Sequence, residues 1–224
     1  MNTPKQVSTS AKGSSLQRKP ERNFALERLA FFSDAVFAIA ITLLALDIQL
    51  PTSLPPDAST VQLLHALLAI SSKYYSYVIS FLAIGLYWLG HHRMFQYISR
   101  YDSILLVLNL LLLLCIAFIP FPSSVIGEYN NQTSNVLYAL TIAITGLIAA
   151  LMWLYASSGG RLLFSKLDRR TFRLNLLRSF LPPILFFLSA AVALWYPQYT
   201  PVLWYLIAVL AFSVTLLTGQ PESL

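Results

Sequence analysis

The side chains of this sequence most able to do chemistry are ionisable and aromatic residues that lie inside long apolar runs. Arg28 and Asp34 lie at the start of the first run, and Trp88 and His92 lie near the end of the second. Ionisable residues within spanning helices are energetically costly and usually functional, so Asp34 needs a partner. On a continuous helix Arg28 and Asp34 stand about 120° apart around the axis. We therefore expect the partner of Asp34 on another helix, or an irregular start to this one.

Trp88 and His92 are candidates for that partner, because residues four apart share a helix face. Both can donate a hydrogen bond to a carboxylate, one through the indole N–H and the other through an imidazole N–H. An interfacial tryptophan beside a solvated histidine explains the same spacing equally well. Arg28 has a simple alternative role as an interfacial anchor whose side chain reaches lipid phosphate.

A second pattern occupies the rest of the first run. Ile39, Leu43 and Leu46 follow the spacing i, i+4, i+7, which makes one stripe along a helix, and Thr42 lies beside it. Such a stripe usually faces lipid or a protein core. If copies of it surrounded a symmetry axis, it would form a hydrophobic constriction of the kind that gates by dewetting.

Other kinds of site have little support in the sequence. The eight glycines form no phosphate-cradling loop and no T-V-G-Y-G carbonyl filter. The three histidines and the single cysteine, Cys115, show no convincing metal-ligand spacing, and Cys115 cannot form an intrachain disulfide. No nucleophile motif supports a hydrolase. We therefore expect no enzyme activity, no cofactor and no resident metal ion.

The composition indicates the environment in which these residues work. Of 224 residues, 57% are hydrophobic and 11% are charged, whereas soluble globular chains carry about 25% charged residues. This excludes an ordinary cytosolic enzyme, a disordered protein and a disulfide scaffold. It indicates a polytopic membrane protein.

Six apolar segments are each close to the roughly 20 residues that a helix needs to cross the hydrocarbon. They are continuously apolar, whereas a transmembrane barrel needs alternating segments of about 10 residues, so we predict an all-α membrane protein. The predicted spans are about 29–50, 74–97, 104–119, 136–155, 180–195 (with an earlier start) and 202–217. The predicted organisation is a flexible cytoplasmic tail at 1–23, a six-helix transmembrane domain at 24–219 and a C-terminal tail at 220–224.

A separate apolar patch at 61–70 precedes the second span and is divided from it by Ser71, Ser72 and Lys73. Either the second helix projects beyond the membrane or the patch lies in the interface, and the sequence leaves both possibilities open. Pro51 ends the first helix before the patch.

The distribution of Lys and Arg predicts the orientation. Of the 15 basic residues, 14 lie before or at the start of the first span, between the second and third, or between the fourth and fifth. Lys73 is the exception. By the positive-inside rule, both termini are cytoplasmic. The net charge of +6 is thus a topology signal, and we expect no nucleic-acid partner.

The first span carries a specific motif, Arg28-x-x-x-Phe32-Ser33-Asp34 followed by Ala-Val-Phe-Ala-Ile-Ala-Ile-Thr-Leu-Leu. It resembles the signature first helix of the transmembrane protein 175 potassium channels, which comprise the lysosomal channel and its prokaryotic relatives. The resemblance extends to the Trp-x-x-x-His pair of the second span, to Leu-Asn-Leu at 108–110 and to Ile-Pro-Phe-Pro at 119–122. Ala35 stands where glycine is common in the family. With one six-helix unit, the chain resembles the prokaryotic, homotetrameric form.

The resemblance implies a potassium-preferring cation channel without a carbonyl filter, in an inner membrane. The partners it implies are potassium and other monovalent cations, which bind only transiently in the pore, the lipid bilayer and three further copies of the chain. Four copies of the first helix would line the pore, with Ile39, Leu43 and Leu46 as hydrophobic layers and Thr42 as a hydroxyl layer. A polar network near the cytoplasmic entrance would hold the pore helices, and its members would be Arg28, Ser33, Asp34, Trp88 and His92.

Three acidic residues lie on the predicted outer side of the membrane, and two functions other than a channel also need consideration. Asp47, Asp57 and Glu128 could concentrate cations at the outer entrance, although solvated loop charges explain them more simply. A proton-coupled secondary transporter using Asp34 and His92 is the main alternative function, but the chain shows no internal repeat and no paired broken helices. A membrane-embedded enzyme or a structural subunit is the third hypothesis.

Overall fold

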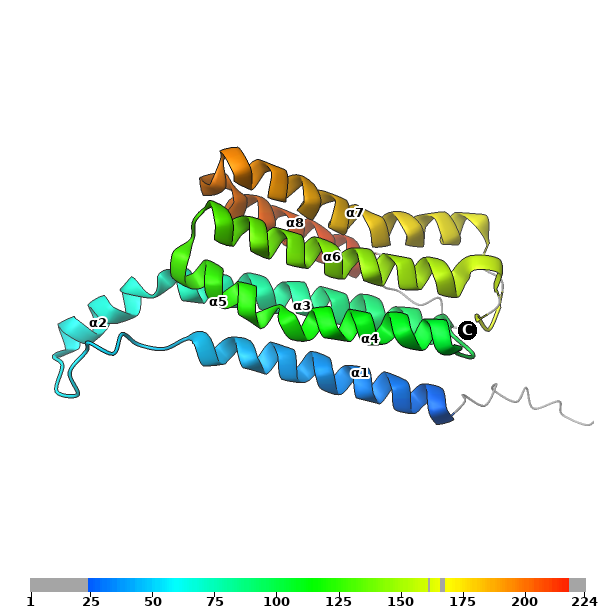
Figure 1. Cartoon of the computed structure of the whole chain (residues 1–224), viewed down its shortest axis with the longest axis horizontal. Coiled ribbons are helices and arrows are strands. Elements are labelled where there is room, and N and C mark those ends of the chain that lie inside the picture. The colour runs from blue at the N-terminus through cyan, green and yellow to red at the C-terminus, as the bar shows by residue number, and fades with distance from the viewer. Residues whose placement is uncertain (1–23, 161, 166–167, 218–224) are drawn as a thin grey trace, which may run out of the picture.

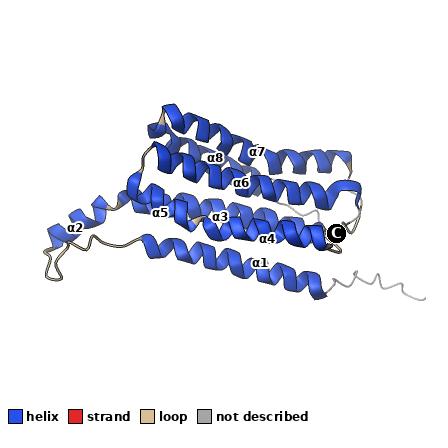
Figure 2. Cartoon of the chain, viewed as in Figure 1, coloured by secondary structure: helices blue, strands red, loops and turns tan. Residues whose placement is uncertain are grey.

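The computed structural model describes residues 24–160, 162–165 and 168–217, and these form long helices that run side by side (Figure 1). In chain order the elements are α1 (Phe24–Leu43), η1 (Leu44–Asp47), α2 (Thr60–Ala69), α3 (Ser71–Tyr97), α4 (Ser103–Phe118), α5 (Pro120–Tyr129), α6 (Gln132–Ser157), η2 (Ser158–Gly160), α7 (Arg169–Trp195), η3 (Pro197–Tyr199) and α8 (Thr200–Leu217). The described residues contain no strand, only one isolated bridge between Ile98 and Leu163 (Figure 2). The prediction of an all-helical protein is confirmed.

Four helical stretches in the described residues are long and apolar enough to cross a membrane. They are Phe24–Asp47, Ser103–Tyr129, Gln132–Gly160 and Arg169–Trp195. A fifth candidate is the pair α2 and α3, which passes the same test only when the two are taken together and is bent by 48° at the break between them. Four of the six predicted segments lie within one helix each, α8 being the last, whereas 29–50 runs past the end of η1 at Asp47 and 104–119 ends one residue beyond α4.

Two boundaries differ from the sequence prediction. The helix predicted near Phe180 starts at Arg169, because Asp168 caps it by accepting hydrogen bonds from the backbone N–H groups of Arg170 and Thr171. The patch at 61–70 is a helix of its own, capped by Ser59 in a capping box with Gln62. The predicted tails at 1–23 and 220–224 lie outside the described residues.

The helix α1 is placed by one buried face. It packs on α3 and α4, and the residues of this face recur every three or four positions, as a helix face requires. These residues are Leu26, Leu29, Ser33, Phe37 and Ala40, and Leu44 of η1 continues the face.

The long helices α6 and α7 pack closely, and a glycine permits the approach. A methyl group built on Gly146 would lie 3.0 Å from the Tyr87 hydroxyl and 3.1 Å from Pro183 Cβ. The α3–α5–α6 contact is polar at its centre, where Ser80 Oγ donates to Ser123 Oγ (2.8 Å). These contacts join α3, α5, α6 and α7 into one body on which α1 lies (Figure 1).

The described segments that carry most of the basic residues lie at one end of this body. The N-terminal end of α1, the α3–α4 turn and the connection before α7 lie at the same end of the bundle (Figure 1). The α3–α4 turn is tied to that connection by hydrogen bonds from Ser99 N to Leu162 O (2.8 Å) and from Phe164 N to Tyr97 O (3.0 Å). Lys73 lies at the opposite end, at the start of α3.

Candidate functional site

The predicted apolar stripe lies on a face of α1 that the rest of the described chain leaves uncovered. Ile39 is 59% exposed, Leu43 41% and Leu46 65%. Thr42 is also exposed, and its hydroxyl donates to the Ile39 carbonyl at 2.8 Å. A lone threonine hydroxyl in an apolar segment commonly bonds to the preceding turn in this way. Its two oxygen lone pairs stay available toward the exposed face.

Helix geometry explains why the stripe is uncovered. At 100° per residue, Ile39 lies about 120° from the middle of the face that packs on α3 and α4, on the uncovered side of the helix. Leu46 belongs to the 3₁₀ turn Leu44–Asp47 and remains on the exposed side. Large apolar side chains are thus displayed along α1 over more than one helical turn. In a membrane such a face meets either lipid or another protein chain.

A buried polar cluster joins α1, α3 and α4. Asn109 is fully buried, and its Nδ2 donates to Ser33 Oγ at 3.0 Å, while its Oδ1 lies 2.9 Å from His91 Nε2. The amide oxygen can only accept, so His91 Nε2 carries the proton and donates to it. Ser33 Oγ in turn donates to the Leu29 carbonyl at 2.9 Å. The Asn109 amide and the Ser33 hydroxyl are thus both hydrogen-bonded, as burial in an apolar bundle demands.

Asp34 has its partner on α3, as its position on α1 requires. Trp88 Nε1 donates to Asp34 Oδ1 at 2.9 Å. The ring of His92 stacks on that of Trp88 with centroids 5.5 Å apart, and no hydrogen bond joins His92 to Asp34 in the described residues. Of the two candidate partners, Trp88 thus bonds to Asp34, and the place of His92 in the polar network stays a prediction. Arg28 lies on the exposed face of α1 and forms no salt bridge with Asp34.

Sequence reasoning missed two members of this polar region, His91 and Asn109, as parts of the site. The His91 ring stacks on the Phe95 ring with their centroids 4.3 Å apart. Its centroid also lies 5.5 Å from that of the Phe37 ring on α1. The signal for Asn109 was present, because an amide in the middle of the apolar run Ile104–Phe118 needs hydrogen-bond partners. The helices α1, α3 and α4 thus share two separate hydrogen-bonded links, one through Asn109 and one through Asp34.

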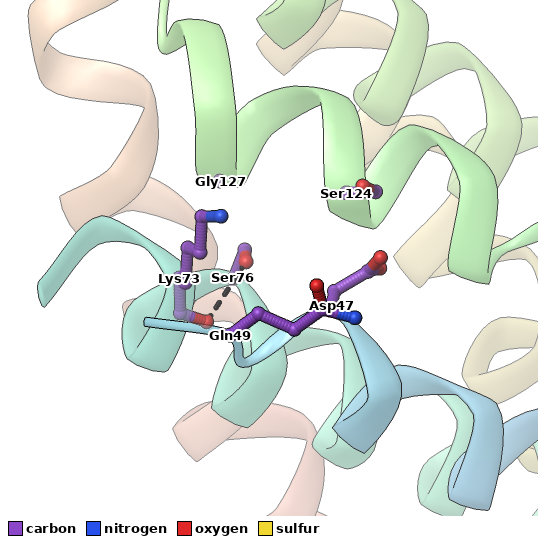
Figure 3. Close-up of a pocket in the computed structure, with 6 residues that line it drawn as sticks. All are labelled: Asp47, Gln49, Lys73, Ser76, Ser124 and Gly127. Atoms are coloured by element: carbon purple, nitrogen blue, oxygen red, sulfur yellow. Dashed lines mark hydrogen bonds between the residues drawn. The ribbon is translucent and has the colours of Figure 1, made fainter. Parts of the chain in front are cut away.

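A polar cavity of about 130 Å³ lies at the other end of α1 (Figure 3). Its lining residues are Asp47, Gln49, Lys73, Ser76, Ser124 and Gly127. Figure 3 shows the side chains of Asp47 and Lys73 on opposite sides of it. Lys73 Nζ lies 3.2 Å from Glu128 Oε2, so the charge of Glu128 is compensated within the chain. In the described residues no group of three or more His, Cys, Asp or Glu side chains is placed to hold a metal ion.

Comparison with known proteins places the chain in a family. The model described as "Endosomal/lysosomal potassium channel TMEM175" matches residues 28–120, which include α1 from Arg28 onward, α3 and α4. A protein of Streptomyces collinus named a potassium channel is 38% identical over 156 residues, which are 67% of this chain and 74% of that protein. The chain belongs to the TMEM175 family.

Two further TMEM175 proteins extend the comparison. The crystal structure of a lysosomal potassium-selective channel TMEM175 homolog from Chamaesiphon minutus superposes with a TM-score of 0.76 at 26% identity, covering 86% of this chain and 99% of that one. The zebrafish (Danio rerio) protein named endosomal/lysosomal proton channel TMEM175 is 34% identical over 132 residues, 58% of this chain but 25% of the zebrafish protein. The TMEM175 model covers the stripe of α1 and both hydrogen-bonded links.

Proposed function

We propose that four copies of this chain form a cation channel that prefers potassium, with α1 of each copy lining the pore. The observation that carries the proposal is the exposure of Ile39, Leu43 and Leu46 on the side of α1 that the described chain leaves uncovered. The bacterial relative and the solved homolog are named potassium channels, which supports the same function here. The family resemblance supports the tetramer, in which the uncovered faces of α1 would meet one another.

In the proposed pore the apolar stripe acts as a hydrophobic constriction. Rings of isoleucine and leucine offer no oxygen ligands, so an ion must pass with most of its hydration shell. A narrow ring dewets and closes, and a wider ring stays wet and conducts. Sodium holds its water more tightly than potassium, so the ring favours potassium modestly. Thr42 adds a hydroxyl layer whose oxygen can accept a hydrogen bond from water of the hydrated ion.

We assign the two hydrogen-bonded links a positioning role. The Asn109 cluster and the Asp34–Trp88 bond hold α1 against α3 and α4 on its far side. The proposed ion path lies on the other side, so these polar groups do not touch the ion there. They set the position of α1 and, through it, the radius of the constriction.

The proposed membrane topology has six spans, with α3 and α8 crossing in addition to the four stretches that qualify alone. Both termini would face the cytoplasm of a prokaryotic cell, with the protein in the inner membrane. Support comes from the asymmetry of basic residues, 14 of 15 on one side, because Lys and Arg stay on the cytoplasmic side.

Flux measurements on purified protein in liposomes test this proposal. A potassium gradient should drive flux through the native protein, and Leu43→Asn or Leu46→Asn should raise it by wetting the constriction. Leu188→Asn on α7 is the matched control, because Leu188 is a leucine on another helix whose exposure (58%) lies between those of Leu43 and Leu46. Absence of flux in the native protein, together with no response to either α1 substitution, would overturn the channel.

The alternative of a proton-coupled secondary transporter is tested in the same liposomes. It relies on Asp34 and His92, but His92 stacks on Trp88 and does not bond to Asp34. Vertebrate relatives are named proton channels, so proton flux is recorded beside potassium flux. Potassium accumulation against its own gradient, driven by a pH difference, would establish the transporter and replace the channel proposal.

A further inference from the structure

The polar cavity beside the end of α1 is walled by three elements of one chain (Figure 3). Asp47 comes from η1, Ser76 from α3 and Ser124 from α5. Its volume of about 130 Å³ is enough for an ion with several water molecules. Gly127 of α5 permits the close approach of Ser76 to this wall, because a methyl group built on the glycine would lie 2.7 Å from Ser76 Oγ. The apolar stripe of α1 does not line the cavity, so the cavity is separate from the proposed pore surface.

One charge of the cavity has no counter-charge. Lys73 Nζ lies 3.2 Å from Glu128 Oε2, so these two charges compensate each other. Within the residues that the structure describes, the partly buried carboxylate of Asp47 accepts no hydrogen bond and forms no ion pair. A partly buried carboxylate is stabilised by a positive charge within about 4–6 Å. The cavity thus has one negative charge in excess and room for a cation to balance it.

Neutral oxygen atoms with free lone pairs surround the same space. Gln49 Nε2 donates to the Leu46 carbonyl at 3.0 Å, which leaves the amide oxygen as the open end of that side chain. Ser76 Oγ donates to the Lys73 carbonyl at 3.0 Å, so its lone pairs remain available. The Ser124 hydroxyl has no hydrogen-bond partner in the described part of the chain. Carboxylate, amide, hydroxyl and water oxygens are the ligands that hard cations prefer.

The number of carboxylates indicates the charge of the ion. Calcium sites draw several of their oxygen ligands from Asp and Glu, whereas this cavity has one uncompensated carboxylate. Among the described side chains, no three from Asp, Glu, His and Cys are grouped so that they could hold a metal ion. A single positive charge therefore balances the cavity, which favours an alkali cation over a divalent one.

We infer that this cavity binds one monovalent alkali cation, with Asp47 as the charged ligand and Gln49, Ser76 and Ser124 as neutral ligands. The ion ties the end of α1 to α3 and α5, because its ligands come from η1, from the segment that follows it and from both of those helices. All four residues belong to one copy of the chain, so the inference depends neither on the proposed assembly nor on ion conduction.

Anomalous diffraction from crystals of the full-length protein tests the site, with thallium(I) as the probe because it substitutes for potassium. We expect one thallium peak in the cavity beside the Asp47 carboxylate, and we expect Asp47→Asn to abolish it. Asp57→Asn is the matched control and should keep the peak, because Asp57 is an exposed acid of the loop before α2 that does not line the cavity. A cavity that holds water only, with no thallium peak in the native crystals, would overturn the inference.

Thermal unfolding in detergent provides a second measurement. At equal ionic strength, replacing N-methyl-D-glucamine by potassium at about ten times its dissociation constant should raise the Tm of the native protein by about 3–5 °C. We expect Asp47→Asn to lose this rise and Asp57→Asn to retain it. Because the rise is compared within each variant, any direct effect of a substitution on stability cancels. An equal rise in Asp47→Asn and the native protein would overturn the site, and a larger rise with calcium than with potassium would overturn the assignment to a monovalent ion.

Discussion

Removal of the Asn109 side chain should destabilise the packing of α1 more than truncation of an exposed apolar side chain on the same helix. In Asn109→Ala, the hydrogen bond to Ser33 Oγ and the one from His91 Nε2 are both lost. Each contributes about 0.6–1.5 kcal/mol. Ser33 keeps its bond to the Leu29 carbonyl, but the buried His91 N–H loses its acceptor, which costs about 1–3 kcal/mol. We expect a loss of about 2–4 kcal/mol in the free energy of unfolding.

Thermal unfolding in detergent measures this change. For a chain of this size the loss corresponds to a fall in Tm on the order of 5–10 °C. Leu114→Ala on the same helix is the control, because Leu114 is 67% exposed and its truncation opens no cavity in the bundle. Equal Tm values for Asn109→Ala and Leu114→Ala would refute the assignment of a buried polar link.

A double-mutant cycle isolates the direct contact between α1 and α4. Asn109→Ala and Ser33→Ala each remove one side of the same hydrogen bond, so their effects should be non-additive by about 0.5–1.5 kcal/mol. Strict additivity would show that Ser33 and Asn109 act independently, and the cluster would then not be the unit described above.

Three further predictions concern single contacts. Trp88→Phe removes the N–H that Asp34 accepts but keeps the ring, so we expect a loss of about 0.5–1.5 kcal/mol in thermal unfolding; a Tm equal to that of the native protein would contradict this role. Gly146→Val drives a side chain into Tyr87 and Pro183 and should lower Tm by several degrees. Gly85→Ala is the control, because a methyl group there meets nothing within 4 Å, and it should leave the packing intact. Equal Tm values for the two variants would contradict the close approach of α6 and α7. Lys73→Met leaves Glu128 without its partner, so the free energy of unfolding should change by less than about 1 kcal/mol. The uncompensated carboxylate should raise the inward cation current at low ionic strength, and high salt should return the current to the native level. A change in current that does not depend on salt would be evidence against attraction of cations by Glu128.

The pattern of α1 was predictable because helix periodicity alone assigns its faces. Ile39, Leu43 and Leu46 share a face in any helix, and the structure leaves that face uncovered. The need of Asp34 for a partner on another helix followed from the cost of a charge among apolar side chains, and Trp88 supplies it. These inferences use only local geometry and the energetics of burial, which the sequence contains.

The choice between adjacent histidines was not predictable. His91 and His92 stand 100° apart on α3, so one turns toward Asn109 and the other lies against Trp88. Which of them faces inward depends on how α3 is rotated relative to α4, and that rotation is set by packing over the whole helix. The partners of Asn109 were unpredictable for the same reason, because Ser33 belongs to α1 and His91 to α3.

The ends of helices were predicted less well than their apolar centres. The first turns of α7 are basic and carry no hydropathy signal, although Asp168 provides a cap. The separate helix α2 could not be distinguished from an extension of α3, because one continuous helix and two helices joined by a 48° bend share the same apolar pattern in the sequence.

The structure of the assembled protein in a lipid bilayer tests the central claim most directly, through the position of Ile39, Leu43 and Leu46 in the particle. We predict that these side chains from several copies face one another around a common axis that passes through the membrane. Contact of the same side chains with lipid tails, with the copies joined through other helices, would contradict it.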